Sequence, residues 1–93
     1  MVGGTRLNHT EFIKRATGIV MNYTNTHMDV TDKAAITEED VYIVWSCKTL
    51  QNSKALLSTT VSDGMYYEVT LNGDKDEIYL DAYKKFQNIC YTF

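Results

Sequence analysis

The chain has 93 residues, of which 44% are hydrophobic and 23% charged, with a formal net charge of −3. A chain of this length builds one domain, residues 1–93, with a single modest core. The nine Lys and Arg residues are scattered, and a net negative protein lacks the basic surface that displaces counterions from phosphate. These features argue against nucleic acid as a partner.

Targeting signals and long apolar segments are not recognisable in the sequence. We therefore expect no membrane partner and a location in the cytoplasm, where thiols are reduced. The two cysteines, Cys47 and Cys90, are then expected to be free, and Cys47 is expected to be a small buried hydrophobe within a strand. Residues 1–7 show no pattern and are expected to form a flexible tail.

The first expected element is an amphipathic helix over residues 9–27. Asn8 is suited to cap it, and Glu11 three residues later completes a capping box. One apolar stripe recurs at spacings of three and four residues: Phe12, Ile13, Ala16, Ile19, Val20 and Tyr23. Gly18 weakens the helix by about 1 kcal/mol, which predicts close packing against a strand. A helix with one apolar face needs a sheet to cover.

Four β-strands are expected after a single helical turn that begins at Thr37. The acidic residues 38–40 suit the start of that turn and are interpreted as solvated. The strands are expected at residues 41–50, 54–61, 65–71 and 76–84, where β-branched and aromatic residues are frequent. Between them lie the turn sequences Gln51-Asn52-Ser53, Ser62-Asp63-Gly64 and Asn72-Gly73-Asp74-Lys75.

Alternation along the strands predicts one face that packs on the helix and one that is open to solvent. The face expected on the helix holds Val41, Ile43, Trp45, Cys47, Ala55, Leu57, Val61, Met65, Tyr67, Val69, Leu71, Ile78, Leu80 and Ala82. The other face holds Tyr42, Val44, Ser46, Lys48, Leu56, Ser58, Thr60, Tyr66, Glu68, Thr70, Tyr79, Asp81 and Tyr83.

Turn chemistry predicts the register of the second hairpin. A three-residue loop at 62–64 gives Gly64 the positive φ that a type I turn with a bulge requires. This loop sets Thr59 opposite Tyr67.

Charge predicts the register of the third hairpin. A two-residue Asn72–Gly73 turn would set Glu68 opposite Glu77, and like charges directly opposite each other destabilise a sheet. A four-residue loop at 72–75, with Glu68 opposite Tyr79, is therefore preferred.

The sequence thus predicts an α+β fold: one N-terminal helix packed on a four-stranded antiparallel meander, as in the cystatin-like arrangement. This likeness concerns topology alone and implies no protease inhibition. Residues 84–93 either extend the last strand past a bulge or turn helical. Extension is preferred, because Ile89, Cys90 and Tyr91 suit strands.

The same strands resemble a known family. The resemblance is carried by Val-Tyr-Ile-Val-Trp-Ser-Cys-Lys-Thr-Leu-Gln-Asn, Lys-Ala-Leu-Leu-Ser-Thr-Thr, Asp-Gly-Met-Tyr-Tyr-Glu-Val-Thr, Asn-Gly-Asp-Lys and Glu-Ile-Tyr-Leu-Asp-Ala-Tyr-Lys-Lys, within residues 41–85. This stretch resembles a family of small uncharacterised phage and prophage proteins of Gram-positive bacteria. The resemblance implies a viral accessory protein that works inside a bacterial cell, and it brings no catalytic residues.

No metal site or cofactor is expected. Asn72, Asp74 and Asp76 alternate like the start of a calcium loop, but no Gly follows Asp76 and no Glu closes the loop at its twelfth position. His9 and His27 share no ligand spacing with a cysteine. These residues are interpreted as turn and surface residues.

A catalytic centre is not expected either. Cys47 lies within an apolar strand, and Ser46 and Ser62 have no histidine tied to them by spacing. Glu68 and Asp81 could form an acid–base pair, but both are expected to face water on the open sheet. The chain is therefore interpreted as non-enzymatic.

The open face is the candidate functional surface, because tyrosine combines rigid apolar area with a hydrogen-bonding tip. The candidate interface residues are Tyr42, Val44, Leu56, Tyr66, Glu68, Tyr79, Asp81 and Tyr83. We expect a phage accessory protein that binds a host or phage protein, or a second copy as a homodimer. The alternative is a small-molecule-binding protein or enzyme with a pocket between helix and sheet, near Trp45 and Tyr67.

Overall fold

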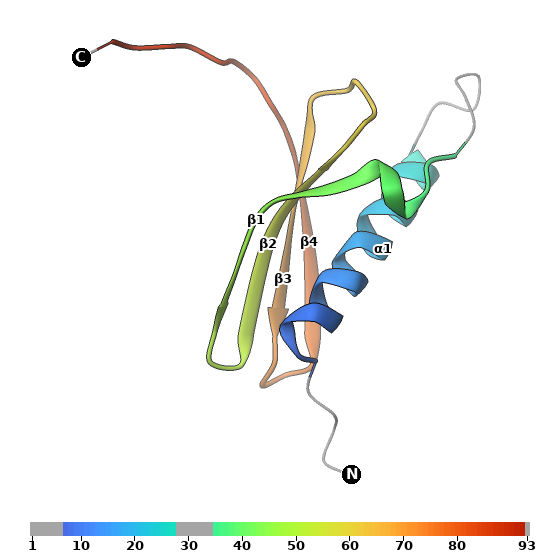
Figure 1. The fold of residues 1–93 in the computed structure, drawn as a ribbon, viewed down its shortest axis with the longest axis vertical. Coiled ribbons are helices and arrows are strands. Elements are labelled where there is room, and N and C mark those ends of the chain that lie inside the picture. Colours follow the sequence, from blue (N-terminus) through green and yellow to red (C-terminus); the bar gives the residue numbers. More distant parts are fainter. Residues whose placement is uncertain (1–6, 28–34, 93) are drawn as a thin grey trace.

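The computed structural model describes residues 7–27 and 35–92. Its elements are helix α1 (His9–His27), the 3₁₀ turn η1 (Glu38–Asp40), and strands β1 (Val41–Thr49), β2 (Asn52–Thr59), β3 (Met65–Asn72) and β4 (Glu77–Lys84). The strands form one antiparallel sheet in the order β1-β2-β3-β4, and α1 lies across one face of it (Figure 1). The predicted α+β fold, one helix on a four-stranded meander, is confirmed.

Reciprocal hydrogen bonds set the start of α1. The Glu11 N–H donates to Asn8 Oδ1 at 2.8 Å, and the Asn8 N–H donates to Glu11 Oε1 at 3.1 Å. This pair is the predicted capping box, and it satisfies two N–H groups that have no partner inside the helix. The η1 turn is closed similarly, because the Thr37 N–H donates to Asp40 Oδ2 at 2.9 Å.

The core lies between α1 and the sheet. Its buried apolar residues are Phe12, Ala16, Val20, Ala55, Leu57, Tyr67, Val69 and Leu71. The helix residues recur every four positions and so form one stripe, and the ring of Tyr23 meets Tyr67 edge-on with centroids 5.6 Å apart. Leu7 is half-buried against this core. The other residues of the predicted flexible tail, 1–6, lie outside the described residues.

Strand β1 contains a bulge that exchanges its two faces. Ile43 pairs with Leu57, but Trp45 pairs with Leu56, so Val44 is an extra residue on β1. Side chains directly opposite each other on paired strands share a face. Trp45 therefore lies with Leu56 on the face away from α1.

The predicted positions of Trp45 and Cys47 in the core are therefore wrong. Trp45 is 43% exposed, and Cys47 is exposed as well. Ser46 and Lys48, predicted on the open face, lie on the helix side instead, and Ser46 Oγ is 3.0 Å from His9 Nε2 on α1. The physical reason is that one inserted residue displaces a two-residue alternation by half a period.

The β1–β2 turn is tighter than predicted. It consists of Leu50 and Gln51, whereas the sequence predicted residues 51–53. Leu50 has a φ of 55°, in the left-handed region where Gly and Asn are favoured. Because neither Gly nor Asn stands at this position, the sequence does not mark the turn.

The β2–β3 hairpin is shifted by two residues from its predicted register. Leu57, rather than Thr59, lies opposite Tyr67, and residues 60–64 connect the strands. Gly64 has the predicted positive φ, at 73°. Because two residues are one full period of a strand, the side chains keep their predicted faces.

The β3–β4 hairpin is also shifted by two residues. Its loop has the predicted four residues but spans 73–76, so that Glu68 lies opposite Asp81 instead of Tyr79. The repulsion that argued against such a pairing is offset by Lys54, whose Nζ lies 3.7 Å from Glu68 Oε2. This cation lies on β2, outside the hairpin that β3 and β4 form.

The C-terminal tail, defined here as residues 85–92, has neither of its predicted conformations. Strand extension and helix are both wrong, because β4 ends at Lys84 and residues 85–92 have no regular structure. The Lys85 N–H donates to Gly64 O at 2.8 Å, and beyond that bond the tail leaves the sheet (Figure 1). Phe86 is 93% exposed and Tyr91 80% exposed.

Gly18→Ala is expected to stabilise the protein by about 1 kcal/mol, because alanine has a higher helix propensity than glycine. The predicted close packing at Gly18 is wrong: a Cβ there would meet only Glu38 Oε2, at 4.0 Å. Urea unfolding followed by circular dichroism measures the change. An unchanged or lower midpoint would show that the position is more crowded than the structure indicates.

Candidate interaction surface

The open face is the sheet surface opposite α1, and paired residues cross it in two complete rows. One row is Trp45, Leu56, Glu68 and Asp81, and the other is Cys47, Lys54, Thr70 and Tyr79. Tyr66 and Tyr83 lie directly opposite each other on β3 and β4. Tyr42 lies on the same face, opposite Ser58.

Most of the predicted interface residues are therefore on one surface. Tyr42, Tyr79 and Tyr83 are each about half exposed, at 49%, 52% and 52%. The others placed on the face are Leu56, Tyr66 and Glu68, which are half-buried, and Asp81, which is exposed. Val44 is the bulge residue and has no cross-strand partner in the register, although its side chain is 45% exposed.

Trp45 is the open-face residue that sequence reasoning missed. Its side chain is 43% exposed. Along β1 it lies between Tyr42 and Cys47, and Cys47 begins the row that crosses to Tyr79. Strict alternation assigned it to the core. The bulge at Val44 carries no Gly or other turn residue that would have signalled it.

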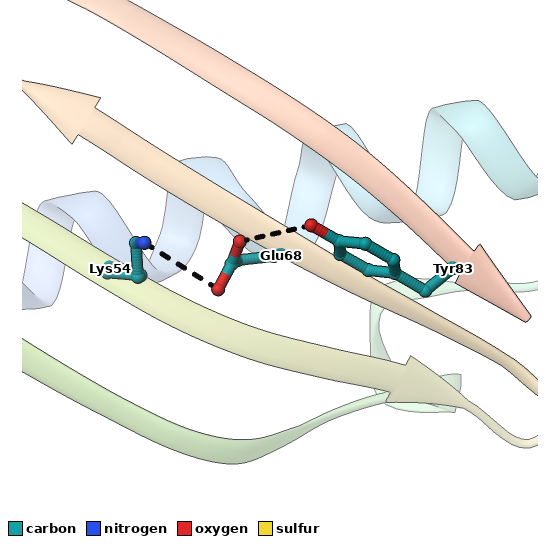
Figure 2. Close-up of polar contacts among 3 residues, drawn as sticks. All are labelled: Lys54, Glu68 and Tyr83. Atoms are coloured by element: carbon teal, nitrogen blue, oxygen red, sulfur yellow. Dashed lines mark hydrogen bonds and ion pairs between the residues drawn. The ribbon is translucent and has the colours of Figure 1, made fainter. Parts of the chain in front are cut away.

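Glu68 joins three strands on this face. Figure 2 shows it on β3 between Lys54 of β2 and Tyr83 of β4, with the helix behind the sheet. The Lys54 Nζ lies 3.7 Å from Glu68 Oε2, and the Tyr83 hydroxyl donates to Glu68 Oε1 at 3.5 Å. This carboxylate therefore contacts a cation and a phenol and also lies directly opposite Asp81.

Carboxylates raise the pKa of two tyrosines on the open face. The charge of Glu68, followed by that of Asp81, raises the pKa of Tyr83. The hydrogen bond from the Tyr79 hydroxyl to Glu77 Oε1, at 2.5 Å, is the main cause of the raised pKa of Tyr79. Both phenols therefore keep their protons to a higher pH than an ordinary tyrosine does.

Glu68→Gln is expected to lower the pKa of Tyr83, because it removes the largest cause of the raised value. Tyrosinate absorbance, compared with that of the matched Tyr83→Phe protein, isolates this group. Glu77→Gln is the control and should lower the pKa of Tyr79 only. If Glu68→Gln leaves the titration of Tyr83 unchanged, the contact between these side chains does not persist in solution.

The raised pKa values of the tyrosines determine whether the free energy of unfolding rises or falls with pH in alkaline solution. Burial raises the pKa of Tyr67, so Tyr67, Tyr79 and Tyr83 all hold their protons more tightly in the folded state than in the unfolded state. Their stabilising effect is complete below the unfolded pKa of 10.0 and is lost as the pH rises through the raised folded values. Unfolding free energy should therefore fall with pH above about 10.

A pocket of about 320 Å³ lies in the open face around Cys47 and Lys54. It is lined by Cys47, Thr49, Asn52, Ser53, Lys54, Thr70 and Asn72. These side chains are mainly polar, so the surface offers hydrogen-bonding groups next to its aromatic residues. Such an arrangement suits a side chain inserted by a protein partner.

A second cavity, of about 250 Å³, lies between α1 and the turns at one end of the sheet. It is lined by Leu7, Arg15, Lys48, Gln51, Leu71, Gly73, Asp76 and Ile78. The predicted helix–sheet pocket was placed near Trp45 and Tyr67. That placement is wrong for Trp45, which lies on the opposite face of the sheet, and Tyr67 is a core residue only 2% exposed.

One serine–histidine contact emerges that the sequence did not reveal. The bulge turns Ser46 toward α1, where its Oγ lies 3.0 Å from His9 Nε2. The other ring nitrogen, His9 Nδ1, is buried and has no hydrogen-bond partner among the described residues. A nucleophilic serine needs a histidine oriented by a third group, so this contact is an incomplete catalytic arrangement.

Asn72, at the start of the calcium-like sequence, forms the hydrogen bonds of a polar turn. Asn72 Oδ1 accepts hydrogen bonds from the N–H groups of Asp74 and Lys75, at 3.2 and 3.3 Å, as in a polar turn. Within residues 7–27 and 35–92, no three His, Cys, Asp or Glu side chains are grouped to hold a metal ion. Neither described helix combines the length and apolar character needed to cross a bilayer.

The described fold, a helix on a four-stranded antiparallel meander with an open aromatic face, defines the chain as a small α+β protein. The chain matches the model of a family of unknown function, DUF6275, over residues 13–93, and it belongs to this family. The matched region includes all four strands and the C-terminal tail. No curated protein and no solved structure matches the chain.

Proposed function

We propose that this protein is a non-enzymatic accessory protein of a phage or prophage that acts in the bacterial cytoplasm by binding another protein through its open face. The partner is a host protein, a phage protein or a second copy of the chain. Phage origin is supported by the resemblance of residues 41–85 to such proteins of Gram-positive bacteria.

The observation that carries the proposal is the exposed Trp45 among the tyrosines of the open face. Trp and Tyr are enriched in the few interface residues that dominate binding energy. Trp45, Tyr79 and Tyr83 come from two different strands and are each about half exposed, so they can be covered by a partner without unfolding the core. Lys54 and Glu68 add a charge pair near the centre of the surface.

Affinity capture from a bacterial host, with the full chain as bait, tests the proposal. Trp45→Ala and Tyr83→Ala are expected to weaken capture of a stoichiometric partner by about 30-fold or more, which corresponds to about 2 kcal/mol. Leu50→Ala is the control, because Leu50 is 85% exposed but lies in the β1–β2 turn.

Thermal melting of the same variants separates binding from folding. The proposal predicts that Trp45→Ala and Tyr83→Ala lose the partner while losing only about 1 kcal/mol of stability, far less than a truncation in the core. If both variants retain the partner at wild-type strength, the open face is not the binding surface.

The cavity between α1 and the sheet supports an alternative function as a small-molecule-binding protein or enzyme. Arg15 and Lys48 bring two positive charges to it and Asp76 one negative charge, so its net charge is positive, whereas Leu71 and Ile78 give it an apolar side. This combination suits a small anion with an apolar group. Native mass spectrometry of protein purified from the bacterial host would detect such a ligand. A metabolite retained by the wild type but lost in Arg15→Ala, with no protein captured, favours the alternative.

A further inference from the structure

The C-terminal tail exposes apolar side chains that nothing in the described chain covers. Phe86 is 93% exposed, Ile89 53% and Tyr91 80%. Beyond the bond from the Lys85 N–H to Gly64 O, the tail makes no backbone hydrogen bond to another described residue. The family match nevertheless runs through the tail to residue 93. The tail therefore belongs to the domain that the family shares.

Strand β1 is an edge strand of the sheet. It is the first strand in the sheet order, and within the described part of the chain no strand lies along its outer side. Every residue of β1 after Val41 is exposed, including Tyr42, Ile43 and Val44. An edge strand with unpaired backbone groups and apolar side chains is a template for an added strand.

We propose that the C-terminal tail of one copy pairs as a fifth strand along β1 of a second copy, and that the exchange is reciprocal. The tail has eight residues and β1 has nine, which correspond to roughly 26 and 30 Å of extended chain. A reciprocal exchange gives a closed two-fold dimer, in which each copy donates one tail and receives one.

Charge favours a parallel direction for this pairing. The tail follows Lys84 and begins with Lys85, whereas β1 follows the acidic η1 residues Glu38–Asp40 and ends near Lys48. Parallel pairing places the two lysines beside the acidic turn, and antiparallel pairing would place them beside Lys48. Opposite charges across strands stabilise and like charges destabilise, so the parallel arrangement is preferred.

This direction brings the two cysteines together across the interface. Cys90 is the sixth residue of the tail, and Cys47 is the seventh residue of β1. With the start of the tail beside the start of β1, Cys90 of one copy lies near Cys47 of the other. Both thiols are free and exposed in the single chain, so a thiol-reactive reagent can reach them.

The dimer goes beyond the proposed function, because the tail occupies the outer edge of β1 and leaves the open face for another partner. Failure of the two ideas is distinguishable. Variants of the tail alter self-association and leave the open face unchanged. Tyr83→Ala alters partner capture and leaves β1 and the tail unchanged.

Sedimentation velocity of the full chain over a concentration series is the first test. The wild type is expected to be a dimer, and Phe86→Asp is expected to raise its dissociation constant at least 30-fold, a usual hot-spot scale. Thr10→Asp adds the same charge at an exposed position on α1 and should leave the mass unchanged. A wild type that sediments as a monomer at all concentrations, or a dimer that survives Phe86→Asp, would overturn the proposal.

Crosslinking with a short bismaleimide is the second test, because this reagent joins two thiols as thioethers without an oxidant. The wild type is expected to give a crosslinked dimer, and Cys47→Ser and Cys90→Ser should each abolish it. Mixing the two single variants should restore it, since the tail of one still meets the edge of the other. A dimer band that persists in Cys90→Ser, or a mixture that gives none, contradicts the exchange.

Discussion

Phe12→Ala is expected to lower the free energy of unfolding by about 3–5 kcal/mol. Phe12 is fully buried in the first turns of α1 and belongs to the cluster formed with Leu57 and Val69. Its removal deletes buried apolar surface and leaves a cavity that the surrounding strands can close only in part. A small domain is stabilised by only about 5–15 kcal/mol, so this loss is a large share of the total. Urea unfolding followed by circular dichroism measures it.

Trp45→Ala is the matched control for that experiment. It removes a larger side chain, yet Trp45 is 43% exposed on the open face and lies outside the core. We therefore expect a loss of about 1 kcal/mol, close to the average for a point substitution. A loss as large as that of Phe12→Ala would mean that the indole is buried and that β1 has no bulge at Val44.

Gly73→Ala is expected to destabilise the protein by about 2–3 kcal/mol, although it adds only one methyl group. A Cβ at position 73 would overlap the backbone oxygen of Gln51 and lie 3.0 Å from its carbonyl carbon. Gln51 belongs to the β1–β2 turn, and the Gly73 N–H also donates to Asn52 Oδ1 at 3.2 Å. The clash is with backbone, so rotation of a side chain cannot relieve it.

Gly18→Ala provides the internal comparison, because the added methyl group at Gly18 meets only Glu38 Oε2, at 4.0 Å, and should stabilise. Urea midpoints of the two variants, measured side by side, should therefore shift in opposite directions. A wild-type midpoint for Gly73→Ala would indicate that the two turns lie further apart in solution than in the structure.

Helix and strands could be predicted because periodicity and turn residues agree along most of the chain. Stripe residues such as Phe12 and Val20 are buried, and the alternation of β3 gives the correct face for Tyr67 and Val69. The exact pairings could not be predicted as well. A shift of two residues preserves every face, so hydrophobic patterning cannot distinguish the registers of the hairpins.

The candidate surface was predictable in β2, β3 and β4 but only partly in β1. Tyr66, Glu68 and Tyr83 lie where alternation places them. Trp45 does not, because a single extra residue at Val44 reverses the faces of the strand beyond it. The pairing of Glu68 with Asp81 was not foreseen: Glu68 was expected opposite Tyr79 to avoid a like-charge pair, and the lysine that lies near Glu68 comes from a third strand.

The simple strand order has a consequence for how the chain folds. Each strand pairs with its neighbour in sequence, and the connections are short at every step. The sheet can thus grow hairpin by hairpin, with little loop entropy lost before each new contact forms. Docking of α1 is different, since the contact of His9 with Ser46 closes a loop of 37 residues. We therefore expect the closure of the helix onto the sheet to be the most entropically demanding contact of folding.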